Sequence, residues 1–285
     1  MMGREELASK NKEVRTLWAV SDLHINSPGN RDTVAELVRP RHPEDWLIVA
    51  GDVAEDPDTV LGVLRELTER FQQVLWVPGN HELYVRVGDG LGVKEKYEYL
   101  VQGCRKLGVL TPEDPYPSFA GHMIAPLFTL YDHTWRPPAT EVGHALSAAE
   151  DAGIVLTDHY AIAPFVSIPK WCSERLHYSV KRLSRVMGPT ILINHWPLVR
   201  EAMGNVTHQE IGLWSGSKHT QHWPVRFRAS QVIYGHLHIP LKLEVDGVTH
   251  TEVSLGYRNE RLRTLAPRVA AGRWPYPVLT EEVQR

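Results

Sequence analysis

The sequence predicts an α/β fold in which short buried strands alternate with amphipathic helices. Three apolar segments of the first hundred residues are short and partly β-branched, as strands covered on both faces are: 16–20, 46–50 and 74–78. Apolar residues at helical spacing lie between and after these strands. With 285 residues, of which 42% are hydrophobic and 23% charged, the chain can bury a large core.

Two helices are predicted in the first half. The first covers residues 56–71, where Asp56 is a candidate N-cap and Pro57 suits the first helical turn. The second covers residues 93–107. Cys104 belongs to its apolar face, so we expect a core residue and not a reactive thiol.

The second half is predicted to continue with strands, one loop and one helix. A strand is expected at 122–128, an irregular loop at 131–140, a helix at 170–187, and buried strands at 190–194 and 231–235. Residues 241–255 are typical of a hairpin that turns at Asp246 and Gly247. No repeat or linker divides the chain, so we expect one domain over residues 1–285. Residues 1–14 should be flexible, and residues 258–285 should pack on the domain as a C-terminal tail.

Composition narrows the class of function. A net charge of −3 gives no overall attraction to long duplex nucleic acid or to a membrane. The N-terminus is charged and lacks the apolar core of a signal peptide, and no apolar run approaches the roughly 18 residues of a membrane span. Two distant cysteines suit a reducing compartment. We therefore expect a cytoplasmic protein, and its oligomeric state stays open.

Polar side chains follow five of the predicted strands: Asp22, His24, Asp52, Asn80, His81, His195, His236 and His238. In α/β sheets, ligands gather beyond the carboxyl ends of the strands. Residues two apart in an extended segment point to the same side, so Asp22 with His24, and His236 with His238, can face one cleft.

These side chains predict a metal site. Carboxylates, imidazoles and one carboxamide, without a thiolate, suit Mn²⁺, Fe or Zn²⁺, and Mn²⁺ is our first choice. The number of ligand groups exceeds what one ion takes, whereas two divalent ions roughly 3.5–4 Å apart, sharing one carboxylate, account for it. A lone Asp-x-His is more often a turn than a ligand pair, so the prediction depends on the ordered set.

That ordered set resembles a known family. The segments SDLH (21–24), GD (51–52), GNHE (79–82), NH (194–195) and GHLH (235–238) are similar to the motifs of the calcineurin-like metallophosphoesterase superfamily. The resemblance implies a four-layer α/β/β/α sandwich with two mixed sheets and a binuclear metal site at the C-terminal ends of strands. It further implies that Asp22, His24 and His238 hold one metal, that Asn80, His195 and His236 hold the other, and that Asp52 bridges both.

The resemblance also implies an activity. The chain is expected to be a metal-dependent hydrolase of phosphate esters that uses a metal-bridging hydroxide. His81 would be the catalytic residue, hydrogen-bonded to a phosphoryl oxygen or protonating the leaving group. The substrate would be a monoester or a diester of a small metabolite or nucleotide. The alternatives on the same fold are a non-catalytic scaffold, which the complete ligand set disfavours, and a metal-binding regulator, which would bind metal without hydrolysing any phosphoester.

Two neighbours of the catalytic histidine raise questions. Glu55 stands where the protein Ser/Thr phosphatases of this superfamily carry an aspartate, and no Arg-Gly follows, which argues against a phosphoprotein phosphatase. Whether Glu55 reaches His81 is left open. Glu82 is expected to support the site or to lie at the surface.

Substrate contacts are expected from two irregular segments, in which aromatic planes lie beside cationic groups that could hold a nucleotide or sugar phosphate. The candidate residues are His133, Arg136, Trp214, Lys218 and His219. The alternative is that the aromatic residues anchor long loops and that the histidines are solvated.

Overall fold

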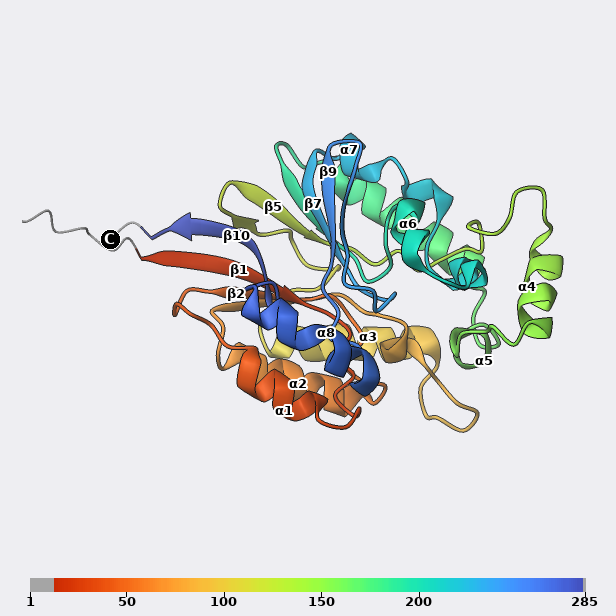
Figure 1. Cartoon of the computed structure of the whole chain (residues 1–285), viewed down its shortest axis with the longest axis horizontal. Coiled ribbons are helices and arrows are strands. Elements are labelled where there is room, and N and C mark those ends of the chain that lie inside the picture. The colour runs from red at the N-terminus through yellow and green to blue at the C-terminus, as the bar shows by residue number, and fades with distance from the viewer. Residues whose placement is uncertain (1–12, 284–285) are drawn as a thin grey trace, which may run out of the picture.

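The fold is a four-layer α/β/β/α sandwich, in which two β-sheets lie face to face and helices cover their outer faces (Figure 1). The computed structural model describes residues 13–283. The first sheet contains, in order, β10 (Tyr276–Glu282), β1 (Val14–Val20), β2 (Trp46–Val49) and β3 (Gln73–Trp76). The second contains β4 (Ser118–Phe119), β5 (His122–Pro126), β6 (Thr190–Ile193), β7 (Ala229–Tyr234), β9 (Val248–Glu252) and β8 (Lys242–Val245).

Both sheets are mixed, and each has a parallel part. β1, β2 and β3 run parallel, with β10 antiparallel at the edge of their sheet. β5, β6, β7 and β9 also run parallel, with β4 and β8 antiparallel at the two edges. The carboxyl ends of the parallel strands in each sheet therefore lie along one edge. The predicted fold class is confirmed.

Helices flank each sheet. Figure 1 shows α1 (Asn30–Leu37), α2 (Pro57–Thr68) and α3 (Val93–Lys106) on the side of the first sheet, and α6 (Ile168–Leu183) and α7 (Trp223–Arg226) on the side of the second. α4 (Val142–Asp151) and α5 (Asp158–Ala161) precede α6, and α8 (Arg258–Ala270) precedes β10. Short 3₁₀ helices cover His81–Leu83, Arg200–Asn205, Gln209–Trp214 and Lys218–Thr220. Among residues 13–283, no helix has both the length and the apolarity that a membrane crossing requires.

Strand alternation builds the layers. Along β1, Leu17 and Ala19 belong to the cluster between the two sheets, whereas Trp18 and Val20 belong to the cluster beneath the helices. Successive side chains of a strand point to opposite faces, so a strand between two apolar layers needs apolar residues at every position. This requirement explains the continuous apolar runs in the sequence.

Several local predictions are confirmed. The Asp56 side chain accepts a hydrogen bond from the Thr59 N–H at the start of α2, and Asp246 and Gly247 join β8 to β9. Residues 131–140 contain no helix or strand.

The segment predicted as a C-terminal tail forms α8 and β10, and β10 completes the first sheet. Of the residues predicted to be flexible, 1–12 lie outside the described residues, and Val14 opens β1. The single-domain organisation stays a prediction.

A buried carboxylate directly before β2 stabilises the first sheet. The side chain of Asp45 is 0% exposed and accepts hydrogen bonds from the Thr16 N–H at 2.7 Å and the Trp18 indole at 2.9 Å. It also accepts from the backbone N–H groups of Arg41 and His42. One side chain therefore connects β1 to the loop that enters β2.

We predict that Asp45→Ala lowers the free energy of unfolding by about 3 kcal/mol, because two buried and two partly buried donors lose their acceptor at once. Urea denaturation followed by tryptophan fluorescence measures the change. Asp151→Ala, at an exposed position of α4, is the control and should shift stability by less than about 0.5 kcal/mol. A loss at Asp45 no larger than that of the control would contradict the prediction.

Candidate metal centre and active site

The carboxyl ends of five strands converge on one site. Asp22, Asp52 and Asn80 follow β1, β2 and β3 of the first sheet, and His195 and His236 follow β6 and β7 of the second. The two sheets also touch here, because a parallel bridge pairs Ser21 with Ser254. The convergence expected from the positions of these residues in the sequence is present in the structure.

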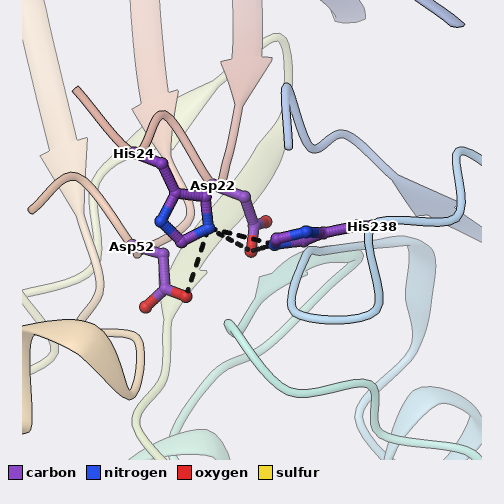
Figure 2. Close-up of side chains that lie close together, drawn as sticks. All are labelled: Asp22, His24, Asp52 and His238. Carbon is purple, nitrogen blue, oxygen red and sulfur yellow. Dashed lines mark hydrogen bonds and ion pairs between the residues drawn. The ribbon is translucent and has the colours of Figure 1, made fainter. Parts of the chain in front are cut away.

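Four of the predicted ligands form one compact group, shown in Figure 2: Asp22, His24, Asp52 and His238. Their potential ligand atoms all lie within 4.8 Å of one another. Nε2 of His238 lies 3.0 Å from Oδ1 of Asp22 and 3.0 Å from Nε2 of His24. Nε2 of His24 lies 3.9 Å from Oδ2 of Asp52. Such a cluster of nitrogen and carboxylate oxygen atoms can hold a divalent cation.

The other predicted ligands form a second group beside the first. Oδ1 of Asn80 lies 3.0 Å from Nε2 of His195 and 3.0 Å from Nδ1 of His236. Oδ2 of Asp52 lies 3.5 Å from Nε2 of His195. The carboxylate of Asp52 therefore lies between the two groups, which is the position that a bridging ligand requires.

In the second group, hydrogen bonds to neighbouring residues point the N–H groups outward and leave the potential metal-ligand atoms facing inward. Nδ1 of His195 lies 2.9 Å from the carbonyl oxygen of Ala50, so this nitrogen carries a hydrogen, and in the neutral ring that a metal requires Nε2 keeps a lone pair. The amide nitrogen of Asn80 donates to the Tyr84 hydroxyl and to Asp158, which leaves Oδ1 facing His195. Two lone pairs 3.0 Å apart repel each other unless a cation lies between them. These two potential ligand atoms, Nε2 of His195 and Oδ1 of Asn80, therefore suit a divalent cation.

The backbone around the site is strained. Five site residues have positive φ angles: Asp22 (51°), His24 (38°), Asp52 (56°), His236 (74°) and His238 (54°). Residues with a side chain rarely adopt this left-handed region, and such strain collects at functional sites where the surrounding structure imposes it. The strained backbone turns each side chain toward the centre directly after its strand.

Two glycines of the motifs allow the close approach. A Cβ atom at Gly79 would lie 2.1 Å from Oδ1 of Asp52, and one at Gly235 would lie 2.1 Å from Oδ2 of Asp22. No side chain fits at these distances. The glycines of GNHE and GHLH are thus required by the position of the two carboxylates.

Glu82 supports the site from behind. Its carboxylate is 0% exposed and accepts hydrogen bonds from the backbone N–H groups of Asp52, Val53 and Gly79 at 2.7–2.9 Å. Burial raises the pKa of Glu82 to about 7. Of the two alternatives stated for this residue, the structure shows the supporting one, since the side chain ties the loop after β2 to the loop after β3.

His81 lies at the edge of the metal-binding groups. Its Nδ1 forms an ion pair with Oε1 of Glu55 at 3.5 Å, which answers the question whether Glu55 reaches it. Its Nε2 lies 3.0 Å from the hydroxyl oxygen of Tyr257. Burial lowers the pKa of His81, but the carboxylates of Asp52 and Glu55 outweigh burial and raise it to about 9.

A cavity of about 280 Å³ opens beside His81. Its lining residues are His24, Asn26, Ser27, Ala54, Glu55, His81 and Tyr257. A second cavity of about 460 Å³ shares Glu55 with the first and extends past Tyr84, Arg86 and Lys96. The first cavity reaches the predicted ligand His24, so it gives a substrate access to the metal-binding groups.

The predicted substrate residues lie elsewhere. None of His133, Arg136, Trp214, Lys218 and His219 lines the cavity beside His81. Trp214 and His133 are only 1% and 7% exposed, and Arg136 is held by the carbonyl oxygens of His133 and Thr140. Lys218 and His219 are exposed. For the buried members, contact with a substrate would need the surrounding loops to move, and the role of the set stays a prediction.

Sequence reasoning missed two residues at the site, Tyr257 and Glu260. The Tyr257 ring stacks on the His24 ring with centroids 4.2 Å apart, and Oε2 of Glu260 lies 3.1 Å from Nδ1 of His238. Glu260 belongs to the segment predicted as a tail (258–285), and Tyr257 directly precedes that segment. The available signal was the glutamate three residues after Tyr257, a spacing typical of a helix start.

Comparisons with known proteins identify the family. The model of the calcineurin-like phosphoesterase family matches residues 15–240. The chain is 41% identical over 256 residues to the [acyl-carrier-protein] phosphodiesterase PptH of Mycobacterium tuberculosis, covering 86% of this chain and 79% of that protein. An uncharacterized protein of Acanthamoeba polyphaga mimivirus is 22% identical over 267 residues, covering 87% and 93%. The crystal structure of the phosphopantetheinyl hydrolase PptH from M. tuberculosis aligns with a TM-score of 0.83 and 40% identity, covering 88% and 93%.

We predict that Asp52→Asn lowers divalent-ion occupancy in both groups, because the Asp52 carboxylate lies next to each of them. Metal content measured after dialysis against a trace of Mn²⁺ tests the prediction. Asp132→Asn, at a partly buried carboxylate that is not part of either group, should leave the content unchanged. Retention of both ions in Asp52→Asn would argue against the bridging position.

Proposed function

The chain belongs to the calcineurin-like phosphoesterase family and is a metal-dependent phosphoesterase, and from this premise we propose that it hydrolyses carrier-protein-linked phosphopantetheine. The similarity to the M. tuberculosis phosphodiesterase over most of both chains carries the proposal. The substrate would then be a protein-bound diester instead of the small metabolite or nucleotide expected at first. Because the chain is an enzyme, the scaffold and regulator alternatives are set aside.

The metal ligands are proposed as the family motifs imply: Asp22, His24 and His238 for one ion, Asn80, His195 and His236 for the other, and Asp52 for both. The lone pairs that face each other in the second group support this assignment. When bound, two divalent ions neutralise phosphoryl charge and lower the pKa of water enough to provide a nucleophile at neutral pH. Mn²⁺ remains the first choice, with Fe or Zn²⁺ as alternatives.

His81 is proposed to protonate the leaving group. Glu55 at Nδ1 orients the imidazole ring, and Nε2 lies next to the hydroxyl of Tyr257, which lines the same cavity. A pKa of about 9 keeps the ring protonated at neutral pH, and a nearby divalent ion would lower this value toward neutrality because like charges repel. As water attacks phosphorus and the bond to the serine oxygen of the carrier breaks, Nε2 can give its proton to that oxygen.

The cavities fit an extended substrate. The cavity beside His81 has room for a phosphoryl group and the atoms next to it. The larger cavity shares Glu55 with it and could take a linear arm, with the Arg86 and Lys96 side chains near the path. A phosphopantetheine arm is linear and carries amide groups, whose carbonyl oxygens the exposed Arg86 side chain can bind, whereas Lys96 already donates to the carbonyl oxygens of Glu55 and Tyr84.

We predict that the Mn²⁺-supplemented enzyme converts a holo carrier protein to the apo form and releases phosphopantetheine. Intact-protein mass spectrometry follows the loss of the arm over time, and Asp52→Asn provides the inactive control. p-Nitrophenyl phosphate and bis(p-nitrophenyl) phosphate, compared as kcat/KM values, should show a preference for the diester. An unchanged holo carrier protein, together with rapid hydrolysis of the monoester, would overturn the proposed substrate.

We predict that His81→Gln lowers kcat on the holo carrier protein by about 10²–10⁴-fold while metal content is unchanged, because an alkoxide leaving group needs a proton. The loss on bis(p-nitrophenyl) phosphate should be much smaller, because p-nitrophenolate leaves without one. Steady-state kinetics on both substrates measure the difference. Equal losses on both would argue against proton donation by His81.

A further inference from the structure

The chain crosses from the second sheet to the first directly beside the site. After β9, the backbone N–H of Leu255 donates to the carbonyl oxygen of Ser21 at 2.8 Å, and the N–H of Gly256 donates to that of Asp22 at 3.1 Å. This pairing brings Tyr257, and with it the first turn of α8, over the metal-binding groups. Figure 1 shows α8 next to the first sheet, where β1 ends.

The side chain of Glu260 holds two groups at once. Its Oε2 accepts a hydrogen bond from the backbone N–H of Tyr257 at 2.6 Å, and it lies 3.1 Å from Nδ1 of His238. The first contact caps α8, and the second ties this helix to the site. Only 29% of the Glu260 side chain is exposed, so the contact with His238 is partly shielded from water.

The contact decides which nitrogen of His238 carries a hydrogen. A carboxylate only accepts, so Nδ1 of His238 is the donor to Glu260. In neutral imidazole, Nε2 then keeps its lone pair, and this atom lies 3.0 Å from both Oδ1 of Asp22 and Nε2 of His24. A carboxylate behind a histidine orients the ring in this way at many metal sites and strengthens its binding to the metal.

The position of Glu260 is itself secured by neighbouring contacts. The guanidinium group of Arg261 donates to the Asn30 side chain, to the Thr33 hydroxyl and to the Pro28 carbonyl oxygen. The N–H of Arg258 donates to the Ser27 hydroxyl. α8 is therefore fixed to the first turn of α1 and the loop before it, and it cannot follow a rotation of His238.

We propose that Glu260 is a positioning residue that holds Nε2 of His238 toward Asp22 and thereby strengthens binding of the ion assigned to the Asp22, His24 and His238 group. The inference rests on the metal assignment of the proposed function, and it is independent of the substrate. It gives the C-terminal helix, outside the motifs of the sequence, a direct role in metal affinity.

The test measures ion binding by the full chain after removal of metal with a chelator. Isothermal titration with Mn²⁺ alone should show two ions for the wild type. Glu260→Ala should weaken one of them by about 10–100-fold and leave the other within about twofold. Glu260→Gln keeps a carbonyl oxygen that can accept from Nδ1, so it should restore part of the affinity. Activity of Glu260→Ala should recover at high Mn²⁺ concentration.

Two variants separate positioning from a general effect on α8. Arg261→Ala removes the hydrogen bonds of the Arg261 side chain to α1 and leaves the contact of Glu260 with His238 intact. It should therefore lower Tm by several degrees without weakening the affinity for one ion more than for the other. Arg263→Ala changes an exposed position of the same helix, away from the site, and should preserve both affinities.

Distinct results would overturn distinct claims. Wild-type affinity for both ions in Glu260→Ala, or the same single-ion loss in Arg261→Ala, would overturn the role of Glu260. A wild-type chain that binds no Mn²⁺ would overturn the metal assignment and this role together. A chain that binds two ions but leaves the holo carrier protein intact would overturn only the substrate, and the Glu260 comparison would still decide the inference.

Discussion

The buried carboxylate of Asp52 is the constraint around which the site is built. Asp52 is 2% exposed, and an isolated charge at that depth would be costly. Burial alone would raise its pKa, but the imidazoles of His195, His81 and His24, each within 3.9 Å, outweigh burial and lower it. When these imidazoles are neutral and offer lone pairs to a metal, the positive charge that Asp52 needs must come from elsewhere, and divalent cations can supply it.

The need to hold these side chains around Asp52 explains the unfavourable backbone conformations at the site. Left-handed φ angles and glycines without room for a Cβ atom are unfavourable locally, and they persist because the surrounding strands are packed on both faces. Glu82 adds to this support by connecting the loops after β2 and β3 from below. The packing of the sandwich thus stabilises a site in which carboxylate oxygens and lone-pair atoms lie close together.

The sequence predicted those parts of the site whose signal is local. A predicted ligand such as Asp22 directly follows an apolar strand. The repeated pattern of an apolar strand followed by a polar residue can therefore be recognised in the sequence alone. Glu260 and β10 gave no comparable signal, because their partners are distant in the sequence: β10 pairs with β1, and α8 is held by Asn30. Aromatic and cationic character predicts the substrate residues, but packing buries Trp214, and that character does not reveal the burial.

The charge of the cavity favours a diester over a monoester. None of the seven residues described in its lining is a lysine or an arginine, and Glu55 contributes a carboxylate. The protonated His81 ring is paired with that carboxylate, so the two side chains leave little net positive charge for the second negative charge of a monoester dianion, whereas a diester carries a single negative charge. The same carboxylate is useful to a diesterase, because it orients His81 toward a leaving oxygen that cannot depart unprotonated. The feature that weakens monoester binding therefore assists diester cleavage.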